Sequence, residues 1–163
     1  MLNEYLEKYH MGKRVFRMQE KLTMLIVDDG EINRAILAQF FKKDYLIIEA
    51  ENGREALGIM ESQPVNIVLL DIIMPVMDGF ELLNRLKRDS NYADIPVVVM
   101  TARNESDSEV RAMEIGAADY IKKPYNPTVV RCRVRNVMAR IENEWRKIEA
   151  KKKERQIMEL HHY

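Results

Sequence analysis

The sequence predicts an α/β fold, a doubly wound five-stranded parallel sheet whose last helix extends beyond the domain. Three observations support this prediction. Short apolar runs alternate with segments of helical spacing over residues 22–141. The runs are apolar almost throughout, as expected of strands buried on both faces. Alternation of this kind is typical of repeated βαβ units, with right-handed crossovers that place helices on both faces of the sheet.

Five apolar runs are the expected strands. In chain order they are "MLIV" at 24–27, "LIIEA" at 46–50, "NIVLL" at 66–70, "PVVVM" at 96–100 and the weaker "DYI" at 119–121. In a sheet of this type, ligands bind at the carboxyl ends of the strands. The residues that follow each run are therefore the first place to look for a site.

The segments after these runs carry apolar residues three or four positions apart, the spacing of a helix face. The expected faces are Ile32, Ile36, Leu37 and Phe40; Ala56, Leu57 and Met60; Phe80, Leu83 and Leu86; Val110, Met113 and Ile115; and Val130, Val134, Val137 and Ile141. Asp78 is expected to cap the third helix, because Gly79 and Glu81 follow it.

Two flanking segments lie outside the expected domain of residues 22–141. Residues 1–20 have loose helical spacing of apolar side chains, which fits either a short helix packing on a partner or a disordered leader. Residues 142–163 are charge-rich and contain no Pro or Gly, so the last helix is expected to continue into them.

The extended helix has two interpretations. Val134, Ile141 and Ile148 recur every seven residues, with Val130 and Val137 between them, which indicates about two heptads of a dimerising coiled coil. The alternative is a solvated helix with a basic face. No nucleic-acid recognition motif accompanies the basic residues, so direct nucleic-acid binding is not expected.

Composition excludes several classes of protein. The formal net charge is zero, which favours neither nucleic acid nor a membrane surface as partner. The single cysteine, Cys132, excludes an internal disulfide and fits a reducing compartment. No apolar stretch approaches the roughly 20 residues that span a bilayer, and the first residues are too polar for a signal peptide. A soluble cytoplasmic protein is expected.

Charged residues follow three of the expected strands. Asp28 and Asp29 follow the first strand, Asp71 the third and Lys123 the fifth, while Thr101 ends the fourth. Because neighbouring strand ends converge in a doubly wound sheet, these side chains are expected to meet. Three carboxylates so close together repel one another unless a divalent cation joins them. Oxygen ligands of this kind suit Mg²⁺, so we predict a magnesium site beside a lysine.

The motifs "VDD", "LLDIIMPVMDG", "MTA" and "KP", in this order and on these strand ends, resemble the receiver domain of bacterial two-component response regulators. The resemblance covers about residues 22–141 and implies a flavodoxin-like fold of the receiver type. It also implies a phosphoacceptor signalling domain that catalyses only its own phosphorylation and dephosphorylation, and not an enzyme acting on an external substrate.

The resemblance assigns roles to residues of this sequence. Asp71 would accept a phosphoryl group from a sensor histidine kinase or a phosphotransfer protein. Asp28 and Asp29 would hold Mg²⁺ together with Asp71 and the backbone carbonyl of Ile73. Lys123 would pair with the phosphoryl oxygens, which agrees with the need of phosphoryl transfer for positioning and charge stabilisation.

The resemblance also implies a switch. The Thr101 hydroxyl would move toward the phosphoryl group, and Tyr120 would rotate inward behind it. The face formed by the fourth helix, the strand at 119–121 and the last helix would carry the change to a partner, a homodimer or a covalently linked output domain outside this sequence, such as a diguanylate cyclase or phosphodiesterase. The family also suggests a cis bond between Lys123 and Pro124.

Two side chains are expected to border the path of a hydrolytic water: Ile73, two residues after Asp71, and Arg103, two residues after Thr101. Ile73 cannot hydrogen-bond a water, and Arg103 has no acceptor with which to serve as a base, so slow self-dephosphorylation is expected.

Three alternatives compete with the receiver interpretation. A haloacid-dehalogenase-like phosphatase requires a second aspartate where this sequence has Ile73. An FMN-binding flavodoxin-like module requires a phosphate loop where "DDGEIN" would repel phosphate. A pseudo-receiver binds partners without phosphorylation, but the complete set of site residues argues against it.

Overall fold

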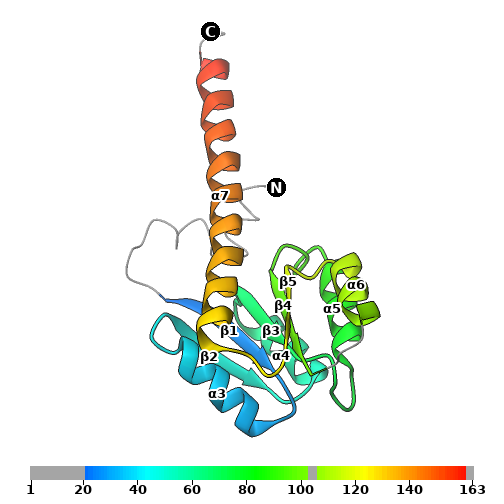
Figure 1. Cartoon of the computed structure of the whole chain (residues 1–163). Helices are drawn as coiled ribbons and strands as arrows, with labels where there is room; N and C mark the ends of the chain where they lie inside the picture. Colours follow the sequence, from blue (N-terminus) through cyan, green and yellow to red (C-terminus); the bar gives the residue numbers. More distant parts are fainter. Residues whose placement is uncertain (1–20, 103–105, 161–163) are drawn as a thin grey trace.

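The computed structural model describes residues 21–102 and 106–160, and these form a parallel sheet covered by helices (Figure 1). The expectations for residues 1–20 and for Arg103 lie outside the described residues. In chain order the elements are β1 (Leu22–Val27), α3 (Glu31–Phe41), β2 (Tyr45–Ala50), α4 (Gly53–Ser62), β3 (Ile67–Leu70), α5 (Gly79–Arg88), β4 (Val97–Thr101), α6 (Ser106–Ile115), β5 (Asp119–Lys122) and α7 (Pro127–Leu160).

The sheet has the strand order β2-β1-β3-β4-β5, and all four strand pairs are parallel. The order reverses at β1, so the carboxyl ends of β1 and β3 lie side by side, with Val27 paired to Leu70. This reversal is where a doubly wound sheet opens a crevice for ligands. Asp28 and Asp71, the residues that follow Val27 and Leu70, are thereby placed next to each other.

Two apolar cores cover the two faces of the sheet. Helices α4, α5 and α6 pack on one face, where Leu82, Leu83 and Leu86 are fully buried. Helices α3 and α7 pack on the other face, around Leu37, Phe41 and three valines of α7. The predicted fold class and the five strands are confirmed.

The predicted apolar face of α3 was partly wrong. Leu37 and Phe41 are buried, whereas Ile32 is 75% exposed and Ile36 is 43% exposed. The helix is rotated so that its buried positions are Arg34, Leu37 and Phe41, at spacings of three and four. A charged residue thus occupies a position that the apolar pattern assigned to the solvent side.

The predicted face of α6 was also partly wrong, although Ile115 packs against the core as predicted. Val110 and Met113 are exposed, while Ser108 and Ala112 are buried. The buried pair lies four residues apart, so the helix rests on the sheet through small side chains. Small residues allow a close approach, which apolar periodicity alone does not reveal.

Helix α7 confirms the prediction that the last helix continues far beyond the sheet. It runs unbroken from Pro127 to Leu160 and projects from the domain as a single rod (Figure 1), about 50 Å long at the usual helical rise. Val130, Val134 and Val137 are buried in the domain. These three heptad positions therefore serve the core of this chain, and a helix pair has only the later positions to use. Within residues 21–102 and 106–160, no helix combines the length and apolarity of a membrane span.

Candidate functional site

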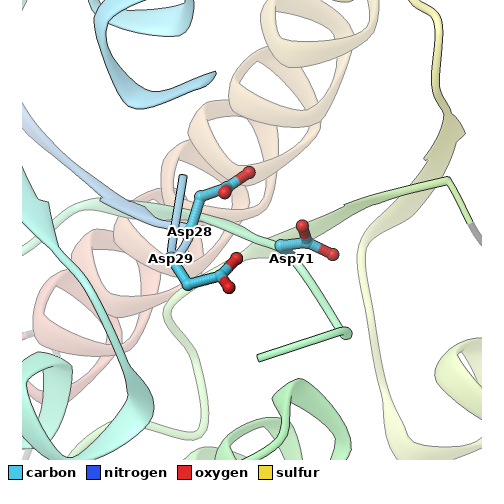
Figure 2. A group of neighbouring side chains, drawn as sticks. All are labelled: Asp28, Asp29 and Asp71. Carbon is cyan, nitrogen blue, oxygen red and sulfur yellow. The ribbon is translucent and has the colours of Figure 1, made fainter. Parts of the chain in front are cut away.

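Three carboxylates meet at the carboxyl ends of β1 and β3. The backbone N–H of Asp71 donates to the carbonyl of Val27 (2.9 Å), which extends the sheet by one step beyond the strands. Asp28, Asp29 and Asp71 each offer a carboxylate oxygen, and these oxygens lie within 4.8 Å of one another. Figure 2 shows the three side chains as neighbours, with their carboxylates extending toward the same side of the view. The strand ends therefore assemble the predicted acidic cluster.

The cluster has the chemistry of a magnesium site. Asp28 and Asp71 are buried, while Asp29 is exposed, so the cluster has one side open to solvent. Hard oxygen ligands from a few carboxylates, with room for water and a phosphate oxygen, are what Mg²⁺ prefers. The residues present fit such an ion.

Lys123 joins the cluster from the far end of the chain. Its Nζ donates to Asp28 Oδ2 and to Asp71 Oδ2, at 2.9 Å in both cases. Its backbone N–H donates to the carbonyl of Thr101 (2.8 Å), which holds the residue against the end of β4. The bond from Lys123 to Pro124 is cis, as predicted. Lys122 points elsewhere, with its Nζ 4.0 Å from Glu109 of α6.

Burial and charge act in opposite directions in this ion pair. Burial raises the pKa of the Asp71 carboxyl above its ordinary value, and the hydrogen bond and charge of Lys123 oppose the rise only in part. Burial by itself would lower the pKa of Lys123, but the hydrogen bonds and charges of Asp71 and Asp28 raise it overall. The charged form of Lys123 is stabilised by two carboxylates, whereas the ionised form of Asp71 is also repelled by Asp28. The ammonium is therefore firmly charged, and Asp71 is the partner that is costly to ionise.

The loop after Asp71 is closely packed against α5. Ile73 N–H donates to Asp71 Oδ1 (3.1 Å), and the Ile73 side chain is 53% exposed at the mouth of the site. Asp78 caps α5, as predicted, by accepting from the N–H of Glu81 (2.9 Å). Gly79 N–H donates to the carbonyl of Ile72 (2.9 Å). A Cβ at Gly79 would press directly on the main chain of Asp71 and Ile72.

The two expected switch residues are buried near this edge of the sheet. Thr101 ends β4 and has no exposed surface. Tyr120 in β5 is 4% exposed, and its side chain belongs to the core that α4, α5 and α6 cover. The ring thus already has the inward orientation in this structure.

Two polar residues of α3 support Asp28 and were missed by pattern reasoning. Asn33 Nδ2 donates to Asp28 Oδ1 (3.3 Å). Arg34 Nη1 donates to the backbone carbonyl of Asp28 (2.7 Å). The signal for Arg34 was its spacing of three residues before Leu37 and seven before Phe41, which places a charge on the buried stripe of the helix.

Comparison with known proteins places this geometry in a family. The family model for the response regulator receiver domain matches residues 24–135. The chain is 38% identical over 119 residues to the phosphate regulon transcriptional regulatory protein PhoB of Pseudomonas aeruginosa, with 72% of this chain and 52% of that protein covered. It is 37% identical over 125 residues to a probable cyclic di-GMP phosphodiesterase of Vibrio cholerae, with 74% and 28% covered.

Solved structures agree with these relatives. A CheY-like receiver domain protein from Methanospirillum hungatei aligns with a TM-score of 0.72 at 26% identity, covering 77% of this chain and 99% of that one. A putative response regulator from Chloroflexus aurantiacus aligns with a TM-score of 0.70 at 28% identity, covering 74% and 99%. The chain therefore spans about half or less of the two curated relatives named above, and nearly the whole of these solved receiver domains.

Proposed function

This chain belongs to the response regulator receiver domain family, and from this membership we propose that Asp71 accepts a phosphoryl group from a sensor histidine kinase or a phosphotransfer protein. One observation carries the proposal. The Asp71 carboxylate lies at the end of β3, paired with Lys123 at 2.9 Å and within a cluster of three carboxylates. The proposed nucleophile and the lysine ammonium thus lie in contact at one edge of the sheet.

The chemistry follows from this arrangement. An oxygen of Asp71 attacks phosphorus, an O–P bond forms and the P–N bond of the donor phosphohistidine breaks, leaving the imidazole to take up a proton. Asp28, Asp29, Asp71 and the Ile73 carbonyl would hold Mg²⁺, which supplies positive charge to the phosphoryl oxygens when bound. The Lys123 ammonium is freed from Asp71 as that carboxylate becomes an acyl phosphate, and it then turns to the transferred group.

A small phosphodonor tests the proposal without a kinase. Incubation with acetyl phosphate and Mg²⁺ should add one phosphoryl group per chain by intact mass, and EDTA should prevent the addition. A phosphatase would instead release many equivalents of phosphate from an external phosphomonoester. Turnover of that kind, without a stable adduct, would contradict the receiver function.

We propose that the conformational change at the site is transmitted to the rest of the domain through β5. Lys122 of β5 pairs with Glu109 of α6 (4.0 Å), and Arg133 of α7 pairs with Asp119 of β5 (3.0 Å). Arg133 also donates to the carbonyl of Tyr120 (3.5 Å). A groove of about 420 Å³ lies on this face and is lined by residues of α6, β5 and α7. A movement of Thr101 and Tyr120 would therefore be transmitted to α7 through strand β5.

We expect phosphorylation to change self-association through α7. Beryllofluoride, a phosphoryl mimic, should shift the wild-type chain toward a dimer in sedimentation velocity at tens of micromolar. Ile148→Glu, which places a charge at an exposed heptad position, should abolish the shift. Ala150→Glu adds the same charge to another exposed position of the helix and is the matched control. A monomer in both states of the wild-type chain would remove the dimer from the proposal.

The lifetime of the phosphorylated state is expected to depend on Ile73. This half-exposed aliphatic group borders the mouth of the site and cannot orient a water. Ile73→Asn should therefore speed the decay of phosphorylated Asp71 by roughly tenfold, the effect of about 1.4 kcal/mol on a barrier. Decay can be followed by intact mass after removal of acetyl phosphate.

Val76→Asn is the control for this lifetime experiment. Val76 lies in the same loop, is 73% exposed and has a φ of 70°, where asparagine is tolerated better than valine. This variant should fold well and keep the wild-type lifetime. If Ile73→Asn decays no faster than Val76→Asn, Ile73 does not control the lifetime.

A further inference from the structure

Arg34 is a charged residue in an apolar setting, and the steps of phosphoryl transfer do not use it. It is 8% exposed and lies on the buried stripe of α3 with Leu37 and Phe41. Arginine is rarely buried to this degree unless its charge is paired and its donors are satisfied. An apolar side chain would serve packing alone at least as well.

The guanidinium of Arg34, on α3, contacts residues at the ends of β1 and β2. Nη1 donates to the Asp28 carbonyl at the end of β1 (2.7 Å). Nε donates to Glu49 Oε1 in β2 (3.1 Å). Nη2 lies 3.9 Å from Glu51 Oε1, just beyond β2. The planar fork therefore has a defined orientation, and its shortest contact is the one to the main chain of the acidic cluster.

The contacted carbonyl belongs to the peptide that joins Asp28 to Asp29. Because a peptide unit is planar, fixing this oxygen also fixes the backbone nitrogen of Asp29 and the direction in which that residue leaves the strand. The Asp28 side chain has its own supports, from Gly30 N–H (2.8 Å) and from Lys123 (2.9 Å). Asp29 is exposed, so its direction depends more on its backbone.

We propose that Arg34 is a positioning residue for the divalent cation: by holding the Asp28 carbonyl it aims the Asp29 carboxylate at Asp71. The inference rests on the magnesium site of the proposed function. Outer partners that orient ligands typically contribute about 10- to 100-fold to metal affinity. Glu49 and Glu51 contribute to the same positioning, because they pair with Nε and Nη2 and so hold the guanidinium in place.

The direction in which Mg²⁺ affinity changes when Arg34 is substituted distinguishes a positioning role from a simple electrostatic effect. A cation near three carboxylates repels Mg²⁺, so removal of the Arg34 charge alone should tighten binding. Loss of the contact that orients the Asp28 carbonyl should instead weaken Mg²⁺ binding. Arg34→Met removes both the charge and the contact, whereas Arg34→Lys keeps the charge but loses the planar fork. Both variants weaken Mg²⁺ binding if Arg34 positions the site.

Mg²⁺ affinity is measured by isothermal titration calorimetry on the full chain, with the folded fraction checked by circular dichroism in EDTA. We expect about tenfold weaker binding in Arg34→Met and a smaller loss in Arg34→Lys. The rate of acetyl phosphate labelling should return to within about twofold of wild type at saturating Mg²⁺. The control is Arg140→Met, since Arg140 also donates to a backbone carbonyl, that of Ala118 (3.0 Å), but outside the acidic cluster.

Tighter Mg²⁺ binding in Arg34→Met, or unchanged affinity in both Arg34 variants, overturns the inference. A lower melting temperature with unchanged affinity likewise shows a role in stability alone. If Arg34→Met fails to fold, the Mg²⁺ affinities of Arg34→Lys and Glu49→Gln test the inference instead. Wild-type Mg²⁺ affinity in both of these variants overturns it. A wild-type chain that binds no Mg²⁺ would instead contradict the proposed function on which the inference rests.

Discussion

Asp71→Asn is expected to abolish labelling by acetyl phosphate completely, while the chain stays folded. Asparagine has nearly the same size as aspartate but lacks the nucleophilic carboxylate. The substitution removes one of three clustered carboxylates, the one that burial makes costly to ionise. Lys123 keeps its second carboxylate partner, Asp28 (2.9 Å). We therefore expect the melting temperature in EDTA to stay the same or rise. The loss of labelling would then come from the missing nucleophile and not from unfolding.

Asp78→Asn is the matched control. It makes the same substitution seven positions further along, in the loop between β3 and α5, where the side chain only caps the helix. Asparagine caps helices as well as aspartate does, so labelling and stability should both be retained. Labelling that persists in Asp71→Asn, or disappears equally in Asp78→Asn, would remove Asp71 as the phosphoacceptor. Intact mass under denaturing conditions measures both variants.

The strand-end residues could be predicted from the sequence because their positions follow from topology. An apolar run that ends at Asp71 specifies a strand, and the parallel order brings its end beside Asp28. The contact of Lys123 with both carboxylates followed from the same argument. No helix orientation was needed for any of these predictions.

The buried faces of the helices were predicted less accurately than the strand ends, because several apolar residues at helical spacing are exposed and do not pack in the core. Ile32 and Ile36 share a helical spacing but are exposed, while Arg34 on the buried side is stabilised by Asp28 and Glu49. A buried arginine becomes favourable only when its partners are known, and those partners lie on other elements. The first valines of α7 were predicted as an apolar helix face and are buried in the core. The same spacing also fitted a coiled coil, and the sequence alone could not decide between the two uses.

Two glycine-to-alanine substitutions should change stability in opposite directions. Gly79 begins α5, and a Cβ there would press on the carbonyl oxygen of Asp71 and on Ile72 Cα, which are main-chain atoms that cannot rotate away. Gly58 lies within α4, where an added Cβ meets nothing within 4 Å. Gly58→Ala should stabilise the chain by about 0.5–1 kcal/mol, because alanine loses less entropy in a helix. Gly79→Ala should destabilise it by about 2 kcal/mol, the usual cost of overpacking.

The effect of Gly79→Ala should extend to chemistry, because the displaced atoms belong to the nucleophilic residue itself. If α5 and the end of β3 move apart, the Asp71 carboxylate shifts relative to Lys123 and Asp28. A misplacement of about 1 Å can cost on the order of a hundredfold in rate. Gly58→Ala should leave the labelling rate unchanged. Thermal unfolding and acetyl phosphate labelling of both variants measure the two effects separately. Wild-type stability and rate in Gly79→Ala would mean that the contact between α5 and the Asp71 main chain relaxes without cost, and that the site does not depend on the close approach glycine permits.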